Sequence, residues 1–285
     1  MPFTLSHAAA VLPAVRSDGT GRGRLVPAAL VAGSFAPDMT YYAASAVPGA
    51  MEFGEVTHSF PGVFSVDVLV AWALVGLWLL VREPLVALLP RPWQPRPAAL
   101  LRCGAPRARL RPSLAAWWYA SAALGALTHV VWDAFTHHDR WGVRLFPVLG
   151  RGLWGSPLYW YLQYGGSVAA AVVIALWVTR ALRRASAHPV TAAVPVLSLR
   201  DRWWACVVIC GCAGVWAVER AARWWAFWGA VAKPWELIPA LCFGAGAGLL
   251  LGLLLYVMGV RVWRPVPSAA EPERVSVEQG RPAGR

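Results

Sequence analysis

Histidine and aspartate residues recur at intervals of four near the end of one of the most apolar stretches in the chain. The segment GALTHVVWDAFTHHD (125–139) contains His129, Asp133 and His137. Because residues four apart stand on one face of a helix, one turn above another, His129 and Asp133 could bind a single metal ion. His137 lies two turns, about 12 Å, beyond His129 along a straight helix. It would therefore serve a second ion or bend toward the first from the helix end.

An ionised carboxylate in an apolar segment needs compensation. Asp133 near hydrocarbon is costly unless it is paired, and a divalent cation would offset that cost and favour neutral imidazole ligands. Asp38, in the apolar segment GSFAPDM, poses the same problem, and the same ion could solve it. The competing interpretation is structural: His129 could hydrogen-bond Asp133, or the nearby Arg140 or Arg144 could pair with that carboxylate. The accumulation of donors within and beside apolar runs favours a metal site.

The composition describes a membrane protein. Of the 285 residues, 58% are hydrophobic and only 14% are charged, which is too apolar for an ordinary soluble domain. Several runs reach the roughly 20 residues that a helix needs to cross a bilayer. The alternation expected of a membrane β-barrel is absent. We therefore predict an all-α, polytopic membrane helical bundle.

The apolar runs predict about five or six membrane helices. Residues 3–15 read as a short helix capped by Thr4 or Ser6, and the 25–47 segment is interrupted by prolines. Asp67 is expected at the membrane interface near the start of its span. Residues 1–260 would form one membrane domain, and the polar tail 261–285 would be disordered and cytoplasmic. The predicted spans are 63–81, 113–135, 158–182, 203–218 and 237–260, with 25–47 as the sixth.

The basic residues lie in the loops between these runs. The net charge is +12, and this placement favours orientation in the membrane and contact with anionic lipid headgroups over nucleic-acid binding. The arginine-rich 82–113 loop and 183–202 linker should face the cytoplasm. The 48–62 segment and the 136–157 loop then lie outside. This places His58 on the same side as the 129–137 cluster, in a multipass protein of the inner (cytoplasmic) membrane.

The order of the polar motifs resembles a known family. Over roughly residues 1 to 180 the chain is similar to the inner-membrane family of membrane-bound, metal-dependent hydrolases, which is distantly similar to zinc-dependent phospholipase C. More narrowly, PFTLSHAAAVLP, APDM and GALTHVVWDAFTH resemble an actinobacterial membrane family of unknown function. The motifs that carry the first resemblance are His7, GSFAPD (33–38), THS (57–59) and LTHVVWD (127–133).

The resemblance implies a divalent-metal cofactor of the zinc type. Its implied ligands are His7, Asp38, His58, His129 and Asp133. Two departures are visible: Thr40 stands where that family has a second acid, and EFGEV replaces a basic residue before THS. Either departure would fit one metal instead of two, or a site without catalysis.

Two functions follow as hypotheses. The first is a metal-dependent hydrolase acting on a lipid-linked or phosphate-containing substrate near the membrane surface, in which the ion lowers the pKa of a bound water. Glu55 or Asp139 would act as the base, and Arg140 and Arg144 would hold an anionic substrate group. The second is a non-enzymatic membrane protein, with a structural, scaffold or transport role and a structural polar or metal cluster.

The N-terminus raises a conflict of topology. Six crossings would place both termini in the cytoplasm, yet His7 could not then join a site on the outer side. If His7 does join it, the 25–47 segment must be re-entrant or half-spanning, which is tolerated where protein buries irregular backbone.

Overall fold

Five long helices dominate the structure, a computed structural model that describes residues 3–105, 112–187, 193–231 and 233–263. Each is long and apolar enough to cross a membrane, which confirms the predicted all-α membrane bundle. The predicted tail falls outside the described residues, except that 261–263 belong to the last helix. The five helices are α6 (Val66–Leu88), α8 (Pro112–Thr136), α10 (Leu158–Arg184), α11 (Leu199–Trp228) and α12 (Ile238–Trp263).

All five helices are longer than the apolar runs that predicted them, α6 and α11 by the most. The helix α6 continues seven residues past 81, through Arg82 and Glu83. These two side chains pair at 2.7 Å, and Glu83 also accepts a hydrogen bond from the Gly104 amide. The helix α11 begins four residues before 203, at a capping box made by Ser198 and Asp201. Charged side chains that find partners at a helix end let the helix extend beyond its apolar part.

The N-terminal region is made of short helices, none of which is among the candidate membrane spans of the described residues. The chain runs through η1 (Thr4–His7), α1 (Ala8–Val11) and η2 (Leu12–Ala14), then returns through α2 (Pro27–Phe35), η3 (Ala36–Asp38) and α3 (Met39–Ala43). The 25–47 segment is therefore a broken, non-spanning element, and His7 lies inside the bundle. The predicted cap is wrong: no side chain caps η1, and Thr4 instead donates to Asp38.

Close packing joins α2 to α8 through two glycines. A Cβ atom on Gly33 would lie 2.2 Å from the Ala122 carbonyl oxygen, and one on Gly125 would lie 2.1 Å from the Leu30 carbonyl oxygen. Only residues without a side chain allow the two backbones to approach so closely. The neighbouring alanines Ala29, Ala122 and Ala126 are fully buried. This contact fixes the depth at which the polar residues of α8 face the N-terminal region.

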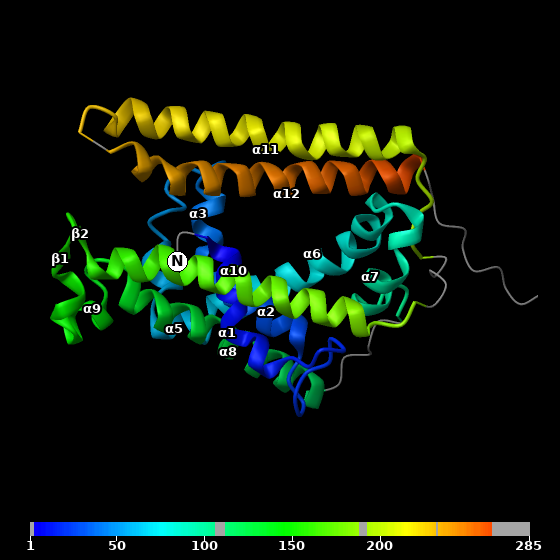
Figure 1. Ribbon diagram of the computed structural model, residues 1–285, viewed down its shortest axis with the longest axis horizontal. Helices are drawn as coiled ribbons and strands as arrows, with labels where there is room; N and C mark the ends of the chain where they lie inside the picture. Colours follow the sequence, from blue (N-terminus) through cyan, green and yellow to red (C-terminus); the bar gives the residue numbers. More distant parts are fainter. Residues whose placement is uncertain (1–2, 106–111, 188–192, 232, 264–285) are drawn as a thin grey trace, which may run out of the picture.

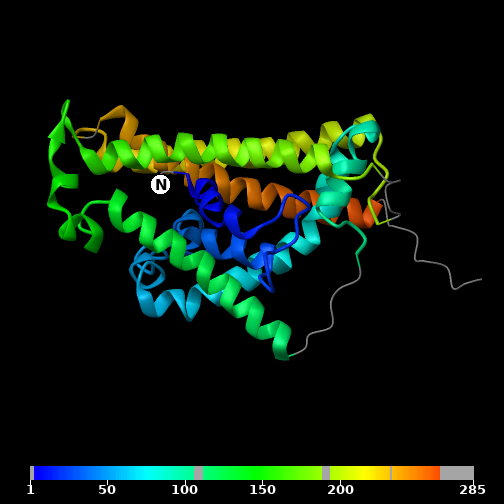
Figure 2. The same cartoon turned by 60° about the horizontal axis from the view of Figure 1, so that its bottom comes forward.

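The helices α11 and α12 form an antiparallel hairpin that lies along one side of the molecule (Figure 1). Gly244 and Gly248 of the FGAGAG segment face α11, where a Cβ atom would meet the carbonyl oxygens of Trp216 and Cys212. These glycines therefore form the face on which α12 packs against α11. Figure 2 shows α8 crossing obliquely to the other long helices.

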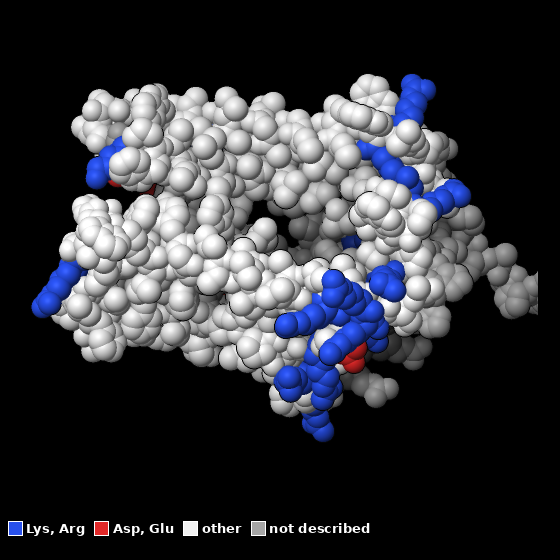
Figure 3. Space-filling model, in the orientation of Figure 1, with Lys and Arg blue, Asp and Glu red and all other residues white. Residues whose placement is uncertain are grey.

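Short elements connect the long helices at the two ends of the bundle. At the end nearest the polar cluster lie α4 (Gly54–Thr57), α5 (Phe60–Val63), α9 (Trp141–Leu145), η5 (Pro147–Gly150) and an antiparallel pair, β1 (Gly152–Leu153) with β2 (Ser156–Pro157). The opposite end carries η4 (Arg91–Trp93) and α7 (Pro95–Leu100), and η6 (Pro234–Leu237) precedes α12. On the face seen in Figure 3, Lys and Arg gather chiefly at that opposite end, and the surface between the two ends is largely uncharged.

Candidate metal centre

Four polar side chains from three separate elements meet inside the bundle. Asp38 ends η3, His58 follows α4, and His129 and Asp133 stand one turn apart on α8. All four are buried, and one ligand atom from each lies within 4.8 Å of all the others. The structure therefore brings together four of the five implied ligands in a group that could hold a metal ion.

The His129 imidazole is fixed by the backbone of α2. Its Nδ1 lies 2.7 Å from the Ser34 carbonyl oxygen. Since a carbonyl only accepts, Nδ1 must carry the hydrogen, and in the neutral ring Nε2 keeps its lone pair. That Nε2 atom is 3.5 Å from Asp38 Oδ1 and 3.4 Å from Asp133 Oδ2. It is buried and has no hydrogen-bond partner among the described residues.

His58 has the same arrangement. Its Nδ1 lies 2.9 Å from the Gly54 carbonyl oxygen, one helical turn earlier. Its Nε2 lies 3.5 Å from Asp38 Oδ1 and 3.7 Å from Asp133 Oδ2. Metal-binding histidines characteristically donate their second ring N–H to a carbonyl or carboxylate, which fixes the tautomer. Both imidazoles thus direct an Nε2 lone pair toward the same two carboxylates.

The spacing and charge of these donors fit a divalent ion. Four ligands placed tetrahedrally at roughly 2.0–2.1 Å from a zinc-type ion stand about 3.3–3.4 Å apart. The His–Asp separations of 3.4 to 3.7 Å are close to that value. Two carboxylates and two neutral imidazoles carry two negative charges, which a divalent cation neutralises. Burial of this group is then far less costly than burial of isolated carboxylates.

The Asp38 carboxylate is also held by the N-terminal segment. Thr4 Oγ1 donates to Asp38 Oδ2 at 2.5 Å. Burial raises the pKa of Asp38, but the facing His129 and His58 outweigh it and hold that pKa below its usual range. In turn, the two carboxylates raise the pKa of His58 although burial lowers it. The cluster therefore attracts cations, and a proton and a metal ion compete for the same donor atoms.

His7, the fifth implied ligand, lies against this group. Its ring stacks on His129 with centroids 3.6 Å apart and planes inclined by 12°. His7 Nε2 lies 3.5 Å from Asp133 Oδ1. Burial, followed by the proximity of His129, lowers the pKa of His7 well below its usual range, which favours the neutral ring. The predicted approach of the N-terminus to the site is thus realised in the structure, at the edge of the four-donor group.

His137 bends in from the end of α8. Its Nδ1 lies 3.6 Å from Asp133 Oδ2 and 3.3 Å from the Asp133 carbonyl oxygen. Its Nε2 is 2.9 Å from the Gln163 side-chain nitrogen of α10. The imidazole therefore links the donor group to α10.

Asp67, which the sequence predicts at the membrane interface, is enclosed by protein. It is fully buried in the first turn of α6, and neither carboxylate oxygen has a hydrogen-bond partner among the described residues. The oblique packing of α8 and the N-terminal region covers this end of α6, a tertiary effect that the position of Asp67 in its apolar run does not reveal.

The predicted base and substrate-binding residues lie around the group rather than in it. Glu55 is exposed on α4, three residues before His58. Asp139 is 78% exposed and pairs with His138 at 2.8 Å. The Arg144 guanidinium donates to the Asp139 carbonyl oxygen at 2.6 Å. Arg140 is half-buried and close enough to Tyr41 to act on its pKa.

The structure adds residues that the sequence interpretation missed. The Tyr41 ring lies 5.5 Å from the His58 ring. Burial and the Asp38 charge raise the pKa of its phenol, against the effect of Arg140. Thr4 and the Ser34 carbonyl orient a carboxylate and an imidazole, respectively. The motif GSFAPD does contain Ser34, but nothing in the sequence indicates that its carbonyl faces His129.

Fold and site together define a multipass membrane protein with a buried Asp–His cluster that could bind a metal ion. The chain belongs to the DUF4184 family, a domain of unknown function, whose model matches residues 1–258. No curated protein and no solved structure matches the chain.

Proposed function

We propose that this protein is a metal-dependent hydrolase of the inner (cytoplasmic) membrane that acts on a lipid-linked or phosphate-containing substrate near the membrane surface. The observation that best supports this proposal is that the Nε2 atoms of two histidines converge on two carboxylates, at His–Asp distances of 3.4 to 3.7 Å. Residues 1–180 would form the metal-bearing part. A bound zinc-type ion would act as a Lewis acid on a phosphoryl or carbonyl oxygen.

Each group of residues has a distinct part in this proposal. Asp38 and Asp133 neutralise the ion, while His58 and His129 complete its ligand set and His7 supports it. Arg140, beside Tyr41, is placed to bind an anionic group that approaches the cluster. Glu55 and Asp139 remain the candidates for the base. Glu55 lies three residues before His58, which faces Asp133, and Asp139 lies two residues after His137, which also contacts Asp133.

One observation favours a second candidate function, a structural metal site. Structural zinc sites are closed by four protein ligands, whereas catalytic sites keep a position for water or substrate. Here four buried donors are already present, and His7 lies against them. A closed site would pin η3, α4 and α8 together without catalysis.

The first experiment measures metal in the purified protein. The detergent-solubilised chain is analysed by mass spectrometry beside His129→Ala and Asp133→Ala, with His138→Ala as a matched control, since His138 is exposed and outside the cluster. We expect one or two equivalents of a zinc-type ion, lost in the first two variants and kept in the third. No metal above background after reconstitution, with all variants folded, would falsify the metalloprotein proposal.

A second experiment separates the enzyme from the structural site. The metal-loaded protein is assayed on phosphoesters and phospholipids, together with Glu55→Ala and Asp139→Ala. An enzyme loses turnover in at least one of these variants while keeping its metal. Full metal content without hydrolysis of any of these substrates would favour the structural site.

A further inference from the structure

Helix α10 borders two hollows of different chemistry. A hollow of about 670 Å³ with a mixed polar and apolar lining, here called the surface pocket, lies beside its first turn, between the end of α8, α9 and the β1–β2 pair. An apolar hollow of about 510 Å³, here called the α10 groove, lies further along the helix against the N-terminal residues. The two follow one another along a single helix that passes the metal centre.

The α10 groove has a floor of small side chains. Ser167, Ala171 and Ala175 recur at four-residue spacing and leave room above the helix, and Phe3 and Leu5 form the facing wall. The α10 side of the groove belongs to a candidate membrane span, so in a bilayer it would face hydrocarbon.

The groove and the metal centre are linked through two segments of the chain. Ser6 lines the groove, and the next residue, His7, lies 3.5 Å from Asp133. Gln163, one turn before Ser167, bonds His137, which also contacts Asp133. A molecule lying in the groove therefore touches residues that adjoin the candidate ligands in the chain.

The dimensions of the groove favour one acyl chain over a helix. From Ser167 to Thr179 the helical rise gives a length of about 18 Å, while one leaflet of hydrocarbon is about 15 Å thick. A helix about 10 Å wide would occupy roughly 1,400 Å³ over that length. The groove offers about 510 Å³. A single chain of methylene groups fits this space, whereas a helix could only lie across its opening.

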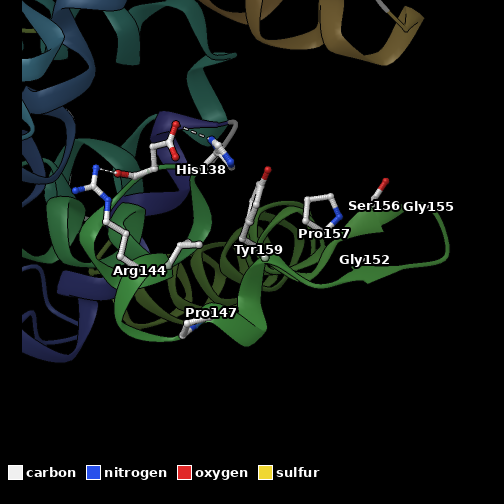
Figure 4. Close-up of a pocket in the computed structure, with 11 residues that line it drawn as sticks. His138, Arg144, Pro147, Gly152, Gly155, Ser156, Pro157 and Tyr159 are labelled. Carbon is white, nitrogen blue, oxygen red and sulfur yellow. Dashed lines mark hydrogen bonds and ion pairs between the residues drawn. The ribbon is translucent and has the colours of Figure 1, made fainter.

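The surface pocket suits the polar end of such a molecule. His138, Arg144, Ser156 and Tyr159 surround it, together with Asp139, whose carboxylate pairs with His138 at 2.8 Å (Figure 4). The Arg144 guanidinium has five N–H donors, of which one bonds the Asp139 carbonyl oxygen. Arginine with hydroxyl and imidazole groups is the combination that binds phosphate oxygens. The pocket begins about 12 Å above the groove, measured along α10 from Tyr159 to Ser167.

We propose that α10 binds an anionic phospholipid of the bilayer, with one acyl chain in the α10 groove and the phosphate group between the surface pocket and the metal centre. This inference deepens the proposed hydrolase and rests on it for the role of the lipid as substrate. Binding of the chain by the groove does not depend on the metal.

The test uses the full-length protein in phosphatidylcholine vesicles that contain a phosphatidylglycerol analogue with a diazirine on one acyl chain. After photolysis, labelled peptides are mapped by mass spectrometry. We expect label in residues 3–6 and 167–179. Ala171→Trp should fill the groove and lower this label about tenfold, equivalent to roughly 1.4 kcal/mol. Val172→Trp is the matched control, because Val172 is 53% exposed and does not line the groove.

Further measurements keep the outcomes distinct. Ala175→Leu replaces Ala171→Trp if that variant does not purify as a single species, and Arg144→Gln should lower labelling by the anionic analogue more than by a phosphatidylcholine analogue. Equal labelling of every exposed face of α10, unchanged in the groove variants, overturns the proposal. Cross-links between groove residues of two chains would identify a second copy as the occupant and overturn it too.

Metal content is measured in the same samples. Groove variants that keep their metal but lose the label support the lipid site without altering the metal proposal. Label that persists in Asp133→Ala after its metal is lost shows that the groove binds the chain without the metal. If the unmodified protein keeps the label but hydrolyses no phospholipid, the groove stands although the hydrolase does not.

Discussion

The imidazoles of His58 and His129 are each oriented by a backbone carbonyl. Because Gly54 and Ser34 supply these carbonyls, the tautomer of each ring is set by the path of the main chain rather than by a mutable side chain. The Nε2 atoms then face the carboxylates without rotation. The site is thereby preorganised for a cation.

Thr4 provides a residue-scale test of this preorganisation. Thr4→Val removes the hydroxyl that donates to Asp38 Oδ2 while keeping the shape of the side chain. We expect metal affinity to fall about 10–100-fold, the usual effect of losing a group that orients a ligand. Affinity is measured by competition with a chromogenic chelator.

Thr40→Val is the matched control, since Thr40 makes only a long 3.5 Å contact to the Pro37 carbonyl oxygen. If both variants bind metal as tightly as the unmodified chain, the Thr4 hydroxyl does not orient the ligand.

At the residue scale the sequence predicts the candidate metal ligands but not the groups that orient them. His129 and Asp133 were recognisable because helical spacing places them together, and Asp38 because it is a charge in an apolar run. Thr4 looked like a helix cap, since its partner lies 34 residues away. Such contacts depend on tertiary packing, which has no periodic signature in the sequence.

At the scale of elements, the contact between α2 and α8 positions the residues of the candidate metal centre. The short helix α2 cannot cross a membrane alone, yet its residues Ala29 and Leu30 are fully buried. Its close approach to α8 delivers the Ser34 carbonyl to His129 and ends at the turn that holds Asp38. The break at APD, a proline-containing turn, is what places a carboxylate inside the bundle.

Gly125→Ala tests this element. The added Cβ atom would meet the Leu30 carbonyl oxygen at 2.1 Å, so the helices must separate. We expect a loss of about 1–3 kcal/mol in stability, as for other overpacked cores, together with weaker metal binding. Thermal unfolding in detergent and metal content measure the two effects.

Gly76→Ala on α6 is the control, because no atom lies within 4 Å of its added Cβ. Its stability should stay equal or rise slightly, since alanine is the better helix former. Equal behaviour of the two variants would contradict a tight α2–α8 contact.

The five long helices were predictable from the length and polarity of their apolar runs, but their ends were not. The extension of α6 depends on the pairing of Arg82 with Glu83 and of Glu83 with the Gly104 amide. The break of the 25–47 segment was visible in Pro37. Its return alongside α8 was not, because Gly33 and Gly125 lie 92 residues apart in sequence.

At the scale of the whole molecule, charge separates the two ends of the bundle. The metal centre and the β1–β2 pair lie toward one end, and most arginines gather at the other (Figure 3). Arginine-rich loops stay in the cytoplasm during membrane insertion. The end that carries the metal centre should therefore face outward.

Single cysteines in a chain without its native cysteines test this orientation. Trp154 is 87% exposed beside β1, and Ser186 is exposed just after α10. We expect Trp154→Cys to react with a membrane-impermeant maleimide in intact cells, and Ser186→Cys to react only after permeabilisation. The reverse pattern would invert the orientation and place the surface pocket in the cytoplasm.

All the candidate ligands lie within the first 133 residues, whereas the α11–α12 hairpin begins only at Leu199. During synthesis at about 5–20 residues per second, Asp133 is added roughly 3–13 s before Leu199, the first residue of the hairpin. The ligand-bearing helices thus enter the bilayer before the hairpin exists. Metal that binds in this interval would join the ligand-bearing helices before the hairpin is made. Metal starvation should therefore lower the amount of folded protein before it lowers the turnover of protein that is already folded.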